Sequence, residues 1–279
     1  VADGRYDGKP LLLDDVQPLE SPVLRQYLKL DKSVDGVVVH HPYRSDATYP
    51  LKEWDVITRI GDYPIDDQGM VKLGPNLRVR FQYRVQQVAK DGKAPLTIIR
   101  DGKTMQVQVP VGGPRPLLIP PLQGSYPSYF VYGPIVFSRA TAEYLSFLNA
   151  NVQLQNAYGF NASPLVTRRG DEPDAQHEEL VVVSSPFFPH KVVTGYSNRF
   201  GSVVESVNGV PVRSLRHLVA LLRDLKDDLV VLRFDQRIGE TMVLPRKAMV
   251  EATEGILQDN GIRSQGSPDM MAVWNGKKI

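Results

Sequence analysis

Three short stretches contain residue types that could do chemistry, and each lacks a partner that the chemistry needs. Gly195–Arg199 begins like the turn that presents a nucleophilic serine, here Ser197, but the closing glycine is absent and no strand-to-helix turn is predicted there. His177–Val181 begins like a zinc-binding helix without its second histidine. His40 and His41 are adjacent in a predicted strand, so their side chains should point to opposite faces and cannot share one metal ion. We therefore expect no catalytic residue, no metal site and no cofactor, and keep a hydrolase with an unrecognised Ser/His/Asp set as the alternative.

The composition excludes further classes. The 279 residues include 33 Lys and Arg against 31 Asp and Glu, a net charge of +2 that gives no basic footprint for nucleic acid. No apolar run approaches the length of a membrane span, so we expect no membrane insertion. The absence of cysteine excludes disulfides and thiolate sites. The sequence begins at Val1 without a basic and then apolar leader, so we expect a processed or shortened form.

An internal repeat organises the elements that remain. Three pairs of segments match in the same order and at similar spacing, and they are Gly36–Tyr43 with Leu180–Phe187, Asp55–Ile65 with Ser202–Val212, and Leu96–Arg100 with Leu229–Arg233. Since order and spacing agree, we predict two copies of one fold of about 110 to 130 residues. The predicted domains are residues 1–113, residues 114–248 with a long insertion at 149–179, and a C-terminal helix and tail at 249–279.

Each copy contains the same sequence of elements. Valine-rich strands lead into a tight turn, Gly61-Asp62 in one copy and Asn208-Gly209 in the other, which is typical of a hairpin. A helix follows, with Ser214 as its predicted N-cap in the second copy, and then two closing strands. Shorter helices are predicted at 22–28, 140–148 and 246–262, and residues 263–279 have the composition of a frayed tail. The predicted fold is α+β and mainly β, with two partly open barrels in tandem and about two helices in each.

The motifs of the second copy resemble those of a known family. A strand, then Asn208-Gly209-Val210-Pro211-Val212, then the helix that begins Ser214-Leu215-Arg216-His217, resembles a PDZ domain in the strand order of HtrA/Deg serine proteases. Tyr126–Phe137, Glu143–Leu145 and Thr194–Tyr196 are similar to the tandem PDZ region of the plant-type branch, and the match runs from about Tyr6 to about Ala248. The catalytic Gly-Asn-Ser-Gly-Gly-Pro motif of the family is absent. The chain therefore resembles the part that follows the protease domain.

The resemblance places a peptide-binding groove in the second copy. A PDZ domain adds an extended peptide to a strand edge beside a helix, and amides of the loop before the strand hold a terminal carboxylate. The expected groove residues are Tyr132, Gly133, Pro134, Ile135, Val136 and Phe137 on the loop and strand, and Leu215, Val219 and Leu222 on the helix. Because Pro134 has no N–H, internal segments are expected to bind in preference to C-termini. The opposing interpretation, that the protein itself covers both faces of this helix, stays open.

The first copy is expected to hold a poorer, secondary groove. Its loop falls at Leu11, Leu12 and Leu13, with Leu13 where the family usually has glycine. Asp14 and Asp15 follow the loop and should repel a carboxylate. Gln82 and Gln86 take the groove positions on the helix, so this groove should be polar. We expect this copy to contact another domain or subunit and the second copy to receive peptides.

The resemblance also implies the partners. The expected function is peptide recognition that supports the assembly or regulation of a Deg/HtrA-type serine endopeptidase. Such an enzyme would act in protein quality control. Expected partners are peptides or unfolded segments, other PDZ domains of one assembly and further copies of the chain. A bacterial source would imply a periplasmic or other extracytoplasmic location.

Overall fold

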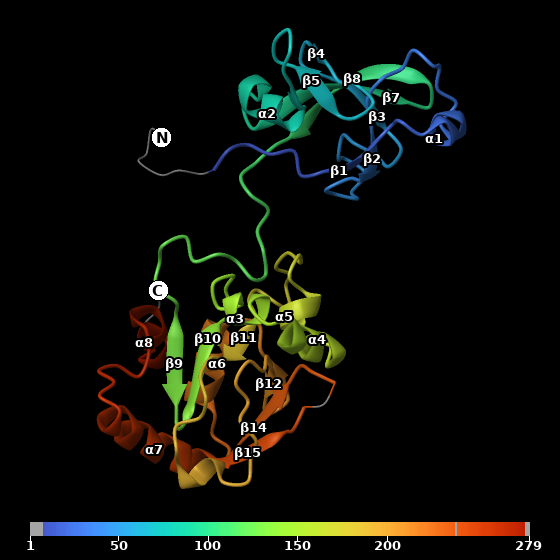
Figure 1. Ribbon diagram of the computed structural model, residues 1–279. Helices are drawn as coiled ribbons and strands as arrows, with labels where there is room; N and C mark the ends of the chain where they lie inside the picture. The colour runs from blue at the N-terminus through green and yellow to red at the C-terminus, as the bar shows by residue number, and fades with distance from the viewer. Residues whose placement is uncertain (1–7, 238, 277–279) are drawn as a thin grey trace. The chain divides into compact units, whose positions relative to one another are not determined.

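The computed structural model describes residues 8–237 and 239–276, and it divides the chain between Arg115 and Pro116. We call the two parts unit 1 and unit 2 (Figure 1). Both combine antiparallel sheets with helices, which confirms the predicted α+β class. Residues 1–7 of the predicted first domain and residues 277–279 of the predicted tail lie outside the described residues.

Unit 1 is one six-stranded sheet, a small hairpin and two helices. Five strands of the sheet lie in the order β1-β2-β3-β7-β8, β4 pairs with β3, and β5 pairs with β6. In chain order the elements are β1 (Asp15–Pro18), α1 (Pro22–Tyr27), β2 (Val37–His41), β3 (Val56–Ile60), β4 (Tyr63–Pro64), β5 (Met70–Lys72), β6 (Arg78–Arg80), α2 (Gln82–Val88), β7 (Lys93–Arg100) and β8 (Lys103–Pro110). The predicted hairpin turn joins β3 to β4 at Gly61, whose φ of +53° favours glycine.

An ion pair between Asp55 and Arg100 links the start of β3 to the end of β7. The Asp55 side chain is 1% exposed, and its two oxygens accept hydrogen bonds from Arg100 Nε at 2.7 Å and Nη2 at 2.6 Å. The same carboxylate accepts from the Lys52 backbone N–H at 2.8 Å, and Arg100 also donates to the Pro50 carbonyl at 2.8 Å. The carboxylate is therefore well paired although it is buried among apolar residues.

Unit 2 has two sheets. One has the order β11-β10-β9 and the other β13-β12-β14-β15, with a bridge from Val182 to Val203 between them. In chain order the elements are β9 (Tyr129–Tyr132), β10 (Ile135–Arg139), α3 (Ser146–Asn149), α4 (Val152–Phe160), α5 (Pro164–Thr167), β11 (Val181–Val183), a 3-10 turn η1 (Lys191–Val193), β12 (Val204–Val207), β13 (Val210–Pro211), α6 (Leu215–Asp224), β14 (Leu229–Phe234), β15 (Met242–Pro245), α7 (Arg246–Asp259) and α8 (Pro268–Trp274).

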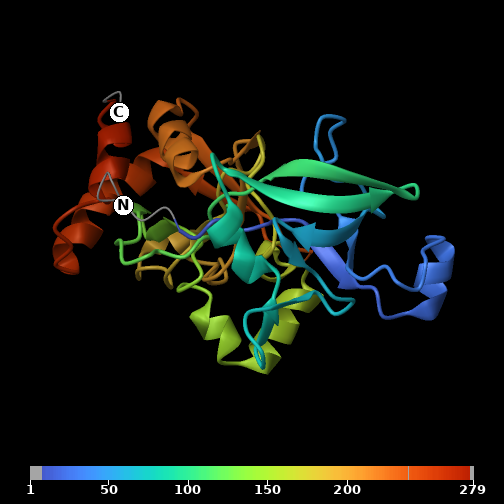
Figure 2. The ribbon, with the colours of Figure 1, turned by 90° about the horizontal axis from the view of Figure 1, so that it is seen from above.

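Helix α6 begins where the sequence predicts. The Ser214 hydroxyl accepts from the His217 backbone N–H at 3.3 Å, which satisfies one free donor of the first turn. Leu215, Leu218 and Val219 are buried in the core of unit 2. Figure 2 shows α8, in red, beside α6, in orange, and the two helices pack against each other. The helix predicted at 246–262 is present as α7.

The predicted insertion contains a helix, and the prediction of a frayed tail was wrong. The stretch predicted as an excursion contains α4, whose N-cap Asn151 accepts from Leu154 N–H at 3.0 Å. None of the residues of α4 is buried, so an apolar stripe of helical period is missing. The predicted frayed tail contains α8, and Met270 and Val273 are 5% and 6% exposed in the core of unit 2.

The expectation for the histidine pair was also wrong. The imidazole rings of His40 and His41 lie 4.1 Å apart, and both residues are exposed. The β1–β2 register shifts between Asp15 and Val16, so two residues of β2 oppose one residue of β1 at this point. Such a bulge breaks the alternation of side chains on which the expectation rested.

Candidate peptide-binding grooves

The strand pairing relates the receiving strand of unit 1 to that of unit 2. In unit 1, Val16 of β1 lies opposite Val39, and in unit 2, Phe137 of β10 lies opposite Val183. Since the β2 and β11 segments match in the repeat, β1 and β10 are equivalent strands. The loop Leu11–Leu13 therefore corresponds to Tyr132–Pro134.

The receiving strand of unit 2 is paired along both edges. β10 pairs with β11 on one side and with β9 on the other, where Ile135 lies opposite Tyr132 and Phe137 opposite Phe130. The edge on which a PDZ domain adds a peptide is thus occupied by the strand just before it. Gly133 makes this return possible, because it has a φ of +55° and a Cβ there would lie 2.8 Å from Met249.

A second segment covers the outer edge of β9. We call Ser264–Ser267 the covering segment. Val131 N–H donates to the Gln265 carbonyl at 2.7 Å, and Ser267 N–H donates to the Tyr129 carbonyl at 3.0 Å. Phe130 and Gly266 form an antiparallel bridge. The chain therefore adds its own extended segment to the sheet of unit 2.

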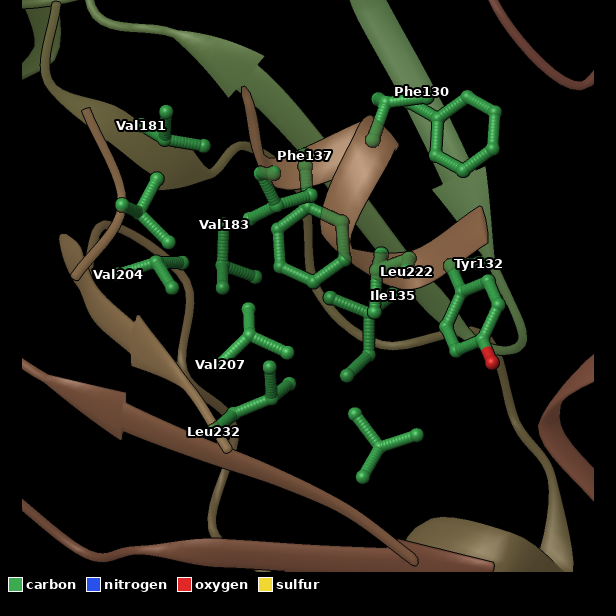
Figure 3. Close-up of a cluster of buried hydrophobic side chains, with 14 of the residues drawn as sticks. Phe130, Tyr132, Ile135, Phe137, Val181, Val183, Val204, Val207, Leu222 and Leu232 are labelled. Carbon is green, nitrogen blue, oxygen red and sulfur yellow. The ribbon is translucent and has the colours of Figure 1, made fainter. Parts of the chain in front are cut away.

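The predicted groove residues of unit 2 lie together and are mostly buried. Tyr132, Ile135 and Phe137 are at most 1% exposed, as are Leu215 and Val219, while Leu222 is 3% exposed. Gly133 and Pro134 are also buried, and Val136 is half-buried. Figure 3 shows Ile135, Phe137 and Leu222 side by side within one hydrophobic cluster. Peptide binding at these residues stays a prediction, and it would require β9 to leave β10.

Unit 1 has the opposite arrangement at its receiving strand. β1 is the terminal strand of its sheet, and within residues 8–237 and 239–276 no strand pairs with its outer edge. The chain before β1 takes a different course, because Leu11 pairs with Gly112 through bonds of 2.7 and 3.3 Å. The Leu13 carbonyl accepts from Arg115 Nη2 at 2.9 Å. The loop Leu11–Leu13 is therefore anchored at the end of unit 1 and leaves the edge of β1 open.

The two acids after this loop have different environments. Asp14 is 7% exposed and accepts from Tyr43 N–H and the Tyr49 hydroxyl, both at 2.9 Å. Burial raises the pKa of the Asp14 carboxyl, although both hydrogen bonds act in the opposite direction. Asp15 is exposed. Of the two predicted repulsive charges, Asp15 is thus the one that faces solvent beside the groove.

Helix α2, the expected wall of the groove in unit 1, is polar at the predicted positions. Gln82 is half-buried, and its Oε1 is shielded from solvent and has no hydrogen-bond partner among the described residues. Gln86, one turn further along α2, is exposed. A buried acceptor without a donor is unfavourable by about 1 to 3 kcal/mol.

The surroundings of Ser197 and of the possible metal ligands bear on the hydrolase alternative. Ser197 N–H donates to Glu240 Oε2 at 3.3 Å, and within residues 8–237 and 239–276 the Ser197 hydroxyl bonds no histidine. In the same residues no three or more His, Asp or Glu side chains lie close enough to hold a metal ion. Nor does any described helix combine the length and apolar character that a bilayer crossing requires.

Neither β9 as a separate strand nor the covering segment was predicted from the sequence. A signal for the second was present. Ser267, Pro268 and Asp269 are an N-cap residue, a proline in the first turn and an acid in the first turn, which together are typical of a helix start. This pattern could have placed α8, and with it the extended residues that lead into α8.

These observations define the class of the protein. The chain belongs to the PDZ domain family, whose model matches residues 121–269. It is 31% identical over 274 residues to Protease Do-like 2, chloroplastic, of Arabidopsis thaliana. The aligned residues make up 98% of this chain and 43% of the relative. It is 28% identical over 272 residues to Protease Do-like 4, mitochondrial, of the same plant, with 96% and 48% covered.

A more distant source gives the same result. The Serine protease DegP homolog of Plasmodium falciparum is 28% identical over 186 residues, which cover 67% of this chain and 20% of the relative. The chain thus spans less than half of the length of these relatives. The predicted resemblance to the PDZ region of Deg-type proteases is confirmed.

Proposed function

We propose that this chain is the peptide-recognition part of a Deg-type serine endopeptidase, and that unit 1 receives extended segments by β-strand addition at β1. The observation that carries the proposal is the unpaired outer edge of β1, which follows an anchored loop. Backbone N–H and C=O groups of such an edge bind an added strand whatever its sequence. This preference reverses the expected order of the two grooves.

The chemistry of the edge favours internal segments over C-termini. The Leu11 N–H and carbonyl are already paired with Gly112, and the exposed Asp15 carboxylate repels a terminal carboxylate. β1 has four residues and ends at Pro18, which has no N–H, so affinity should be modest.

In unit 2 we propose a role in assembly and regulation. There β9 and the covering segment already fill the position of an added strand. A stable, self-covered sheet suits contacts with other PDZ domains or with further copies of the chain, while peptide capture by residues 132–137 would follow only on release of β9.

An NMR titration tests the proposal. The 279-residue chain, labelled with ¹⁵N, is titrated with an extended peptide that is blocked at both ends and with the same peptide carrying a free C-terminus. We expect the amide signals of residues 15–17 to shift, those of residues 135–139 to stay, and the blocked peptide to bind at least as tightly. Shifts confined to β10, or clearly tighter binding of the free C-terminus, would sink the proposal.

A groove variant sharpens this test. Gln86→Val installs the residue type of Val219, its equivalent on α6, and should increase affinity for peptides with a leucine or valine side chain by about 3- to 10-fold. Gln106→Val is the matched control, because Gln106 is exposed on β8 away from the groove. Equal gains from both variants would show that the added affinity does not come from the groove of unit 1.

A further inference from the structure

A pocket of about 320 Å³ lies in unit 2 between α7, the end of β9 and the end of α8. One face of α7 forms its wall, with Val250, Thr253, Glu254 and Leu257 at helical spacing. Tyr132, Gln265 and Trp274 complete the lining. The pocket shares Tyr132 with the expected groove of unit 2, but it is lined by neither β10 nor α6 and does not depend on the proposed function.

Tyr132 lines this pocket, and its hydroxyl is shielded from solvent without a partner. Tyr132 is 1% exposed, and its hydroxyl has no hydrogen bond to any described residue. Figure 3 shows the hydroxyl pointing away from the other labelled side chains of the cluster. By contrast, the Thr253 hydroxyl in the same wall donates to the Met249 carbonyl at 2.9 Å and accepts from Gly133 N–H at 2.8 Å. A buried phenol without a partner is rare and points to a missing ligand group.

The remaining polar character of the pocket is that of an acceptor. The Tyr132 phenol is neutral at physiological pH, and its oxygen can accept a hydrogen bond. Burial raises its pKa further, to about 12. Glu254 is exposed at the pocket and contributes a carboxylate. Arg246 is the cation that interacts electrostatically with Tyr132. Its Nε donates a hydrogen bond of 2.8 Å to the Asp227 carbonyl.

Aromatic and aliphatic surfaces surround these acceptors. The Trp274 ring packs 5.0 Å from Phe130 and 6.3 Å from Tyr132, the latter at an interplanar angle of 67°. Val250 is 45% exposed and Leu257 is half-buried, so alkyl surface is open to a ligand. An indole face attracts cations, and a long basic side chain covers apolar surface with its stem while its charged end meets acceptors.

We propose that this pocket binds the basic side chain of a partner peptide, with the alkyl stem against Val250, Leu257 and Trp274 and the cationic group at Tyr132 and Glu254. The site adds a charge preference in unit 2 that backbone pairing alone cannot supply. A single side chain of this size should bind in the millimolar range, which corresponds to about 4 kcal/mol.

The test follows the indole N–H signal of Trp274 in the 279-residue chain. The probe is Nα-acetyl-lysine methylamide, and the comparison is Nα-acetyl-norleucine methylamide, which has a similar alkyl chain without the charge. We expect a saturable shift of the Trp274 signal with the lysine derivative and at least a 5-fold weaker response to norleucine. The signal of Trp54, in unit 1, is the internal reference. No shift, or equal shifts with both probes, would overturn the proposal.

Two variants assign the contacts. Glu254→Gln should weaken binding of the lysine derivative about 3- to 10-fold, while Glu251→Gln is the control, since Glu251 pairs with Lys247 at 3.8 Å and does not line the pocket. Tyr132→Phe should weaken binding and leave the melting temperature equal or higher, because it removes a buried hydroxyl that has no partner. Unchanged binding in both variants, or a marked loss of stability in Tyr132→Phe, would contradict the assignment.

Discussion

The receiving strands of the two units differ in what happens to the chain just before them. In unit 1 that chain pairs with Gly112 and leaves the outer edge of β1 unpaired among the described residues. In unit 2 it turns back at Gly133 and becomes β9, which the covering segment then pairs in turn. The difference shows that one fold can present or cover the same edge, depending on a turn of two residues outside the repeated core.

The groove-facing helices of the two units, α2 and α6, also differ in polarity. α6 carries Leu215 and Val219 against the core, whereas α2 carries Gln82 and Gln86 at the equivalent positions. An apolar helix face left open would associate nonspecifically, so it is covered in unit 2. A polar face tolerates water and can stay open in unit 1.

The largest expected effect concerns the ion pair that only unit 1 possesses. In the repeat, Ser202 takes the place of Asp55, so Asp55→Ala should lower the free energy of unfolding of unit 1 by about 3 kcal/mol and leave unit 2 unchanged. The estimate is at the lower end for a broken buried pair because Arg100 is 29% exposed and regains water. Urea unfolding followed at the Trp54 and Trp274 indole signals separates the units, and equal losses in both would contradict their independence.

The covering segment of unit 2 provides a second, smaller effect. A Cβ on Gly266 would lie 2.9 Å from a Phe130 ring carbon and 3.0 Å from the Tyr129 carbonyl oxygen. Gly266→Ala should therefore destabilise unit 2 by about 1 to 3 kcal/mol. Gly255→Ala is the matched control on α7, where a Cβ meets nothing within 4 Å, and it should stabilise unit 2 by about 0.5 to 1 kcal/mol. Effects of the same sign at both glycines would refute the pairing of the covering segment with β9.

The smallest expected effect is a dependence on pH that is confined to unit 1. Because burial raises the pKa of Asp14, the folded unit binds this proton more tightly than the unfolded chain. Relative to the Asp14→Asn variant, the natural chain should thus gain stability as the pH falls through the folded pKa toward the ordinary value of 3.8. Ile135 is the equivalent residue in unit 2, which should show no difference between the two proteins. Urea midpoints from pH 7 to pH 4 measure the effect, and a loss of relative stability on acidification would refute it.

Much of the fold followed from local patterns in the sequence. Asn208-Gly209 predicted its hairpin because both residues tolerate positive φ, and the structure gives 47° and 82°. Ser214 predicted the start of α6 because a hydroxyl there satisfies a free N–H of the first turn. Such signals depend on neighbouring residues and are therefore readable without the tertiary structure.

The state of the two grooves could not be predicted in this way. The residues of the groove in unit 2 were brought together as expected, but whether they are open depends on pairing between Val131 and Gln265, which no local pattern encodes. Likewise, Leu11–Leu13 looked like a poor loop for binding a carboxylate, and nothing in its sequence revealed that pairing with Gly112 leaves β1 accessible. Long-range pairing decided both outcomes.

The covering segment has a further consequence for synthesis on the ribosome. Gln265 follows its partner Val131 by 134 residues in the chain. At about 5 to 20 residues per second, β9 emerges roughly 7 to 27 s before the segment that covers it, whereas every described residue of unit 1 has already been made. During that interval the nascent chain carries an uncovered strand edge, which is the kind of surface that chaperones hold and that aggregation exploits.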